Sequence, residues 1–175
     1  LISPAALAQR LVRAKAKIRQ ANIPMVMPEP RDLLRRVDDV LTCIYAGYTV
    51  GYDALGRDPR TAEISQESMR LGELMTRMVA HHPEALGLAS LMHMNESRRR
   101  ARRAPDGTFV PLAEQDVSLW DVVLIDQGEA ELRAAACIRQ VGRFQIEAAI
   151  QSVHCARLKD RKSTRLNSSH ATLSR

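Results

Sequence analysis

Cationic side chains crowd the first predicted helix of this sequence, and a helix of this kind could bind an anion. Residues 3–19 carry five cations and no acid: Arg10, Arg13, Lys15, Lys17 and Arg19. Ser3 is a good N-cap and Pro4 suits the first helical position, so the helix is predicted to begin here. Phosphate is the anion that so basic a helix most often meets, which indicates nucleic acid as a partner.

The same segment also has an apolar face. Its members recur at helical spacing: Leu7, Leu11, Ala14 and Ile18. The cations lie mostly off this face, so the helix is predicted to bury one side and to offer the other to an anion. A basic, solvated helix end is the alternative that this pattern leaves open.

Residues 2–15, ISPAALAQRLVRAK, resemble the recognition helix in region 4 of bacterial RNA polymerase sigma factors of the extracytoplasmic-function type. Ala6 stands where that family usually has threonine, and the matching positions are Ser3, Leu7, Arg10, Leu11, Arg13, Ala14 and Lys15. In a helix-turn-helix, the first residues of this helix reach base edges and later cations hold phosphates. The resemblance therefore implies a DNA-binding set of Ser3, Ala5, Ala6, Gln9, Arg10, Arg13, Lys15 and Lys17.

The rest of the chain, to about residue 157, resembles the C-terminal extension of one group of these sigma factors. The strongest matches are HPEALGL at 82–88, PLAEQD at 111–116 leading into LWD at 119–121, and FQ at 144–145. This resemblance implies an all-α chain with a tetratricopeptide-like extension built of helical hairpins. It implies promoter recognition and transcription initiation in the cytoplasm. The implied partners are promoter DNA, core RNA polymerase (mainly through a region before Leu1) and a protein partner of the extension, with no membrane.

Four segments are predicted along the chain. Residues 1–20 form the end of sigma region 4, residues 21–30 a proline-rich linker, and residues 31–159 the helical extension. Residues 160–175, DRKSTRLNSSHATLSR, have no apolar periodicity and resemble a translated sequencing adapter, so we expect a disordered tail without evolved function. Because the sequence starts at Leu1 without an initiator methionine, we expect a fragment whose first helix-turn-helix helix lies upstream.

The charge is unevenly distributed. The net charge is +6, but residues 1–20 contribute +5 and residues 160–175 contribute +3. The middle of the chain is mildly acidic outside the arginines of 98–103. Nucleic-acid affinity is therefore predicted for the first helix and not for the extension. For the arginine cluster, the sequence favours a solvated cap at a helix C-terminus over a contact to acidic protein or to DNA.

Five helices are predicted after the linker, over residues 31–47, 61–81, 83–96, about 117–139, and 144–157. Val37, Leu41, Ile44 and Tyr48 recur at helical spacing and are predicted to form an apolar stripe on the first of them. Two of them form a hairpin at His81-His82-Pro83, which is the unit of helical-repeat architectures. Asp116 or Ser118 is predicted to cap the fourth helix, and Trp120 to anchor that helix in the core.

Catalytic and metal-binding patterns are missing from the sequence. The four histidines before the tail, at 81, 82, 93 and 154, have neither zinc-finger nor HExxH spacing, and no phosphate loop or nucleophile elbow occurs. Cys43 and Cys137 lie in apolar helical contexts and are predicted to be small core residues. The sequence thus indicates a protein that is not an enzyme and that needs no cofactor and no metal.

Two other functions remain open from the sequence alone. One is a helical scaffold that binds a peptide or protein, with the basic helix as an end cap. The other is a ligand sensor that uses the cluster of Tyr45, Tyr48 and Tyr52, although such a cluster is more often the edge of a core.

Overall fold

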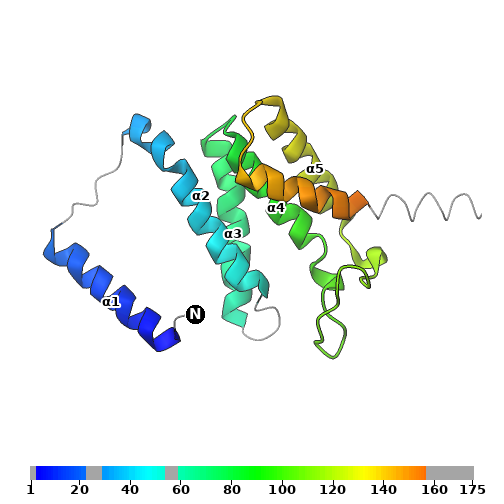
Figure 1. Cartoon of the computed structure of the whole chain (residues 1–175), viewed down its shortest axis with the longest axis horizontal. Coiled ribbons are helices and arrows are strands. Elements are labelled where there is room, and N and C mark those ends of the chain that lie inside the picture. The colour runs from blue at the N-terminus through cyan, green and yellow to red at the C-terminus, as the bar shows by residue number, and fades with distance from the viewer. Residues whose placement is uncertain (1–2, 23–28, 54–58, 157–175) are drawn as a thin grey trace, which may run out of the picture. The chain divides into compact units, whose positions relative to one another are not determined.

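The chain is all-α in its computed structural model, which describes residues 3–22, 29–53 and 59–156 (Figure 1). This confirms the predicted fold class. Its elements are α1 (Pro4–Gln20), α2 (Pro30–Asp53), α3 (Pro59–Met78), α4 (Pro83–Glu96), the short 3-10 turns η1 (Arg99–Ala101) and η2 (Val117–Leu119), and α5 (Val122–Cys137). A final helix follows over residues 143–156. The chain divides into two compact units, residues 1–33 and 34–175.

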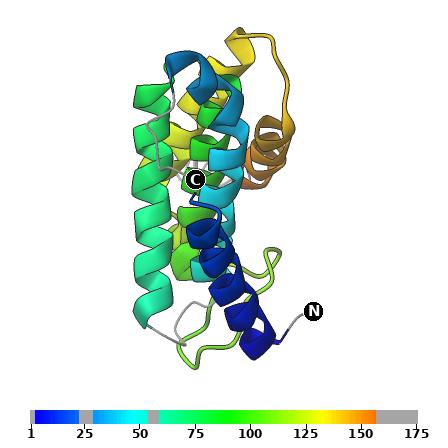
Figure 2. The same ribbon diagram turned by 90° about the vertical axis from the view of Figure 1, so that its left-hand side faces the viewer.

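Helix α4 is the centre of the second unit. Ten of its fourteen residues are buried, on every side of the helix. Helices α3 and α5 both pack against it, and Figures 1 and 2 show these helices side by side. A helix that is apolar all round must be enclosed, because no face of it favours water. Its residue types, mainly Ala, Leu and Met, therefore determine its place in the fold.

Helix α2 covers one side of α4 with the stripe that the sequence predicted. Val37, Leu41, Ile44 and Tyr48 are all buried and share one core with Leu88, Met92 and Phe144 of α4 and the final helix. The helix is longer than predicted, because it continues through Gly47 to Asp53. A Cβ at Gly47 would lie 2.7 Å from Ser68 Oγ, so the glycine lets α2 and α3 approach closely. Tertiary contact therefore outweighs the low helix propensity of glycine.

A second core forms around Trp120, which is buried and packs with Met94, Ile125 and Cys155. The prediction that Trp120 is buried is confirmed, but its placement within a helix was wrong. It stands between η2 and α5, in extended backbone. Asp116 caps η2 only, and Asp121 caps α5 by accepting hydrogen bonds from the first backbone N–H groups of that helix. Two consecutive Asx caps split what looks like one helix in the sequence.

The hairpin of α3 and α4 forms at the predicted place. Helix α3 ends at Met78 and α4 begins at Pro83. His81 adopts a left-handed φ of 70°, which reverses the chain between them. Pro24 and Pro28 of the predicted linker lie outside the described residues, whereas Pro30 begins α2. The predicted tail also lies outside them.

The cysteine prediction was wrong. Cys43 and Cys137 are exposed, and only Cys155 of the three is buried. Both exposed residues lie on helices whose apolar stripes point elsewhere, so an apolar neighbourhood in sequence did not imply burial. Burial also raises the pKa of the Cys155 thiol, although the charge of Arg98 acts in the opposite direction.

This difference predicts how the thiols react. With a maleimide at neutral pH, Cys43 and Cys137 should be modified at least about tenfold faster than Cys155, because only exposed thiolates react readily. Timed labelling followed by peptide mass spectrometry measures the three rates. In guanidinium chloride the rates should converge, and equal rates in the folded protein would contradict the assignment.

Candidate nucleic-acid interface

The basic helix α1 begins where the sequence predicts. Ser3 is its N-cap, and the Ser3 hydroxyl accepts a hydrogen bond from the Ala6 backbone N–H at 3.3 Å. Pro4 occupies the first turn, where a missing N–H costs nothing. Lys17 and Arg19 lie in the last turn, where cations are favoured by the helix dipole. Local sequence signals are therefore enough to define both ends of α1.

Three of the predicted cations share one face of α1. Arg10, Arg13 and Lys17 are three and seven residues apart, so a regular helix places them in one row. The Arg13 Nε–H donates to the Gln9 carbonyl oxygen at 3.4 Å, which lays this side chain along the helix. Lys15 does not join the row, since its position falls on the other side of the apolar stripe.

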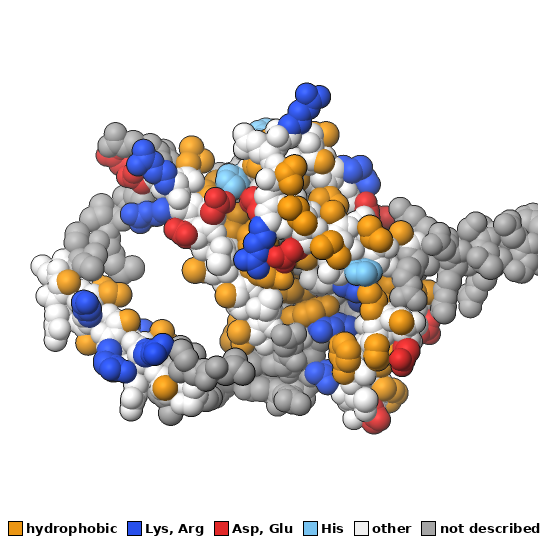
Figure 3. All heavy atoms as spheres, viewed as in Figure 1, with side chains coloured by type: hydrophobic (Ala, Val, Ile, Leu, Met, Phe, Trp, Pro, Cys, Tyr) orange, Lys and Arg blue, Asp and Glu red, His pale blue; other side chains and the backbone are white. Residues whose placement is uncertain are grey.

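The predicted DNA-contacting side chains are available to a ligand. Ser3, Gln9 and all the cations of α1 are exposed, and Ala6 is half-buried. Ala5 belongs to the helix, but its side chain lies outside the described part of the structure. Figure 3 shows Lys and Arg spheres along α1 with no acidic sphere among them. The electrostatic character of α1 is thus purely positive.

The apolar face of α1 is also exposed. Leu11 is 54% exposed and Ile18 51%. The side chain of Leu7, the remaining large member of the predicted stripe, is outside the described residues. Exposed aliphatic residues at helical spacing favour a helix that packs against another helix in its working state.

The arginine cluster at the end of α4 is not a solvated cap, and that prediction was wrong. Arg98 is buried. Arg99 is ion-paired with Glu96 and donates through Nη2 to Ser65 Oγ at 2.8 Å. The guanidinium of Arg102 lies 3.8 Å from the centroid of the Tyr52 ring. Of this cluster, Arg100 is exposed.

The tyrosines of α2 belong to the core. Tyr48 is fully buried and its hydroxyl donates to the Met92 carbonyl oxygen at 3.4 Å. The Tyr52 hydroxyl donates to the Asn95 carbonyl oxygen at 3.0 Å, and that of Tyr45 to Glu147 Oε2 at 3.1 Å. All three hydroxyls therefore have partners inside the protein.

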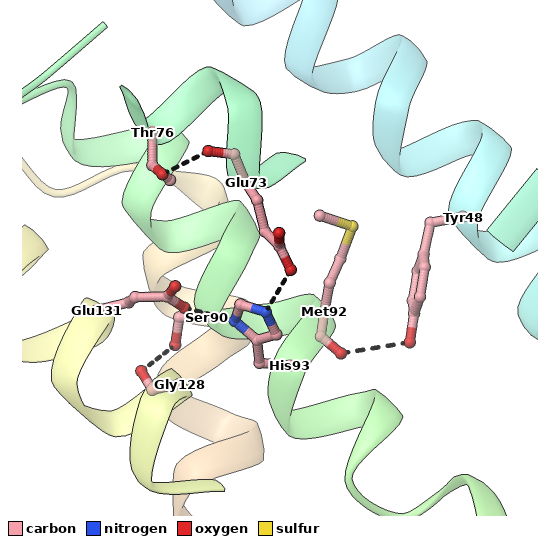
Figure 4. A network of polar contacts seen from close by, with 8 residues as sticks. All are labelled: Tyr48, Glu73, Thr76, Ser90, Met92, His93, Gly128 and Glu131. Atoms are coloured by element: carbon pink, nitrogen blue, oxygen red, sulfur yellow. Dashed lines mark hydrogen bonds and ion pairs between the residues drawn. The ribbon is translucent and has the colours of Figure 1, made fainter. Parts of the chain in front are cut away.

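A buried histidine joins three helices of the second unit (Figure 4). His93 of α4 is 1% exposed, with Nδ1 2.8 Å from Glu131 Oε2 of α5 and Nε2 3.5 Å from Glu73 Oε1 of α3. Burial lowers the pKa of His93, but the hydrogen bonds and charges of Glu131 and Glu73 outweigh it, and the pKa is raised. This network positions helices, and its one signal in the sequence is a histidine on an apolar helix.

Neither a metal site nor a membrane span is found among the described residues. Within those ranges, no group of three His, Cys, Asp or Glu side chains is arranged to hold a metal ion. None of the helices in the same ranges has the length and apolar character that crossing a bilayer requires.

The described residues thus define an all-α domain with a buried central helix, and the comparisons with known proteins identify its family. The sequence matches the family of unknown function DUF6596 over residues 36–136, and the chain belongs to this family. It is 37% identical over 155 residues to an uncharacterized protein of Rhizobium meliloti (strain 1021). That alignment covers 88% of this chain and 37% of the relative, so the chain spans little more than a third of its length. No solved structure matches the sequence.

Proposed function

We propose that this chain is part of a bacterial sigma factor of the extracytoplasmic-function type. In this proposal α1 reads the upstream promoter element, and the helical domain is a regulatory extension that binds a partner or core RNA polymerase. The observation that carries the proposal is the pairing, on one short helix, of an exposed row of cations with an exposed apolar face.

Each face of α1 has a role in a helix-turn-helix. The row of Arg10, Arg13 and Lys17 suits contacts to successive phosphates, while the capped N-terminus carries the residues that would approach base edges. Leu11 and Ile18 would pack against the first helix of the motif. Leu11 and Ile18 are seven residues apart, so they lie on one side of α1, as packing against a neighbouring helix requires.

Sequencing the genomic locus upstream of Leu1 is the direct test of the proposal. An open frame that continues into a core-binding sigma region supports it, because a sigma factor needs that region to act on polymerase. A frame that instead encodes an unrelated domain contradicts it and favours the scaffold function.

The next test is transcription initiation by the full gene product with core RNA polymerase. The triple variant R10Q/R13Q/K17Q should lower initiation at its promoter at least about tenfold. It should also make the plot of the logarithm of the DNA-binding constant against the logarithm of the salt concentration less steep. The slope should fall by about one unit for each phosphate that is no longer neutralised. R133Q removes a single exposed cation from α5, where it is ion-paired with Glu129, and is a control outside α1 that should behave as wild type. Equal activity of the triple variant and wild type would refute the role of α1.

The 175-residue chain by itself should bind promoter DNA weakly and without sequence preference. Helix α1 exposes the apolar face that its partner helix would cover, so nothing holds it at a fixed angle in a groove. Fluorescence anisotropy in a salt titration measures this. Tight, sequence-specific binding by the chain alone would contradict the expectation.

A further inference from the structure

A small polar pocket lies at the end of α4, in the second unit. It has a volume of about 250 Å³, just below the usual range of ligand sites of about 300–1,000 Å³. Five segments contribute to its wall: the end of α2, the end of α4, the two residues that flank η1, the loop before η2, and the final helix. The residues that matter here are Arg98, Arg102, Gln115, Gln151 and His154.

Arg98 supplies a buried positive charge in this pocket. It is 7% exposed, and each of its hydrogen bonds goes to a neutral acceptor. Its Nε–H donates to the Met94 carbonyl oxygen at 3.4 Å, and its Nη2 donates to Asn95 Oδ1 at 2.9 Å and to Gln151 Oε1. Within the described residues, no carboxylate lies at ion-pair distance from Arg98. A buried charge without a counter-charge favours the arrival of an anion.

Gln115 supplies the complementary group. It is 5% exposed, and its Nε2 donates to the Val110 carbonyl oxygen at 3.1 Å. Because that carbonyl only accepts hydrogen bonds, the orientation of the amide is fixed, and Oε1 is the free end. Within the described residues, Gln115 Oε1 has no hydrogen-bond donor. A buried amide oxygen without a donor is costly, and a ligand N–H or O–H would satisfy it once the Gln115 side chain turns Oε1, which is closed to solvent in the structure, toward the pocket.

The remaining wall limits the size and polarity of the occupant. Phe109, which is exposed, forms an apolar part of the wall beside the guanidinium of Arg102, which lies 5.7 Å from its ring centroid. His154 of the final helix is half-buried in the same wall. Groups on both sides of the pocket can thus hydrogen-bond, and its volume admits only a small molecule.

We propose that this pocket binds a small organic anion that carries a hydroxyl or amino group close to its carboxylate or phosphate. The anionic group pairs with the Arg98 guanidinium, and the hydroxyl or amino group donates to Gln115 Oε1. The proposal is independent of DNA binding by α1, because every residue it uses lies in the second unit.

The first experiment measures binding of two probes to the full chain, glycerate for a carboxylate and glycerol 3-phosphate for a phosphate. Propionate has the charge without the hydroxyl, and glycerol has hydroxyls without the charge. The fluorescence of Trp120, the single tryptophan, reports occupancy because its ring centroid lies 6.0 Å from the Arg98 guanidinium. We expect saturable binding of at least one probe, at least tenfold weaker binding of propionate, and none of glycerol. Whichever probe binds more tightly identifies carboxylate or phosphate as the natural anionic group.

The second experiment assigns binding to the pocket. R98Q should weaken the bound probe at least about tenfold, because it removes the buried charge that the anion pairs with. R100Q makes the same chemical change at the exposed neighbour and should bind as wild type. Equal binding by R98Q and wild type would overturn the proposal.

A measurement on the unaltered chain covers the case in which R98Q does not fold. In ¹⁵N NMR spectra, the Nε–H signal of Arg98 and the side-chain amide signals of Gln115 should shift together and saturate as the probe is added. If neither probe shifts these signals at roughly 10 mM, a concentration that would fill a site of 1 mM affinity, the proposal is wrong.

Discussion

Replacing Gly87 by alanine is expected to lower the free energy of unfolding by about 1–3 kcal/mol, because the added methyl group overpacks a contact between backbones. A Cβ at Gly87 of α4 would lie 2.8 Å from the Gln145 backbone nitrogen and 3.1 Å from the Phe144 carbonyl carbon. The final helix cannot easily retreat, since Glu84 accepts hydrogen bonds from the Phe144 and Gln145 N–H groups at 2.9 and 3.3 Å. Within a helix, alanine is normally more stabilising than glycine by roughly 1 kcal/mol. The cost of overpacking should outweigh this gain, so the net effect is a loss of stability.

Gly72→Ala is the matched control. A Cβ at Gly72 would meet only the flexible end of the Met92 side chain, with Met92 Cε at 2.2 Å and Sδ at 3.8 Å. The thioether can rotate away, so this variant should be neutral or slightly stabilising. Urea unfolding followed by circular dichroism gives both values. A Gly87→Ala variant as stable as Gly72→Ala would show that the final helix does not pack on α4 as described.

Replacing Glu131 by glutamine is expected to cost about 1.5–3 kcal/mol at pH 6, which is the usual contribution of a hydrogen bond to a charged group. His93 has a carboxylate oxygen at each ring nitrogen, and both nitrogens can donate only when the imidazole is protonated. Glutamine keeps the shape of Glu131 but removes the nearer negative charge. Glu114→Gln makes the same change at an exposed position and should leave stability unchanged.

The pH dependence of stability separates this network from ordinary packing. Because the pKa of His93 is raised in the folded chain, the folded state binds the proton more tightly than the unfolded state does. The stabilisation is therefore fully present below about pH 6.5, the ordinary value for histidine, and it is lost as the pH rises through the raised value.

Wild type should accordingly lose stability over that window, while Glu131→Gln should lose much less. Urea unfolding at a series of pH values measures both curves. If the two curves stay parallel across the window, His93 is not the titrating group.

Much of the helical framework could be predicted from the sequence, because its signals act over a few residues. Ser3 with Pro4 defines the start of α1, and Pro83 defines the start of α4. The apolar spacing of α2 identified the face that the core buries, from Val37 to Tyr48. Caps, proline geometry and periodicity need no knowledge of distant residues, so they are readable in a single sequence.

The candidate site on α1 was predictable for the same reason. Its cap, its cations and its apolar stripe all depend on helix geometry within one segment. The separation of Lys15 from the row of Arg10, Arg13 and Lys17 also follows from the angle between successive residues.

Only the tertiary structure decided which polar groups are buried. Arg98 belongs in the sequence to a basic run that indicates solvation, but Gln151, fifty-three residues further along the chain, accepts a hydrogen bond from it in the folded protein. His93 likewise stands as an isolated histidine until α3 and α5 bring Glu73 and Glu131 to its two nitrogens. Burial of a charge depends on groups that are distant in sequence and adjacent in space, and local pattern carries no information about them.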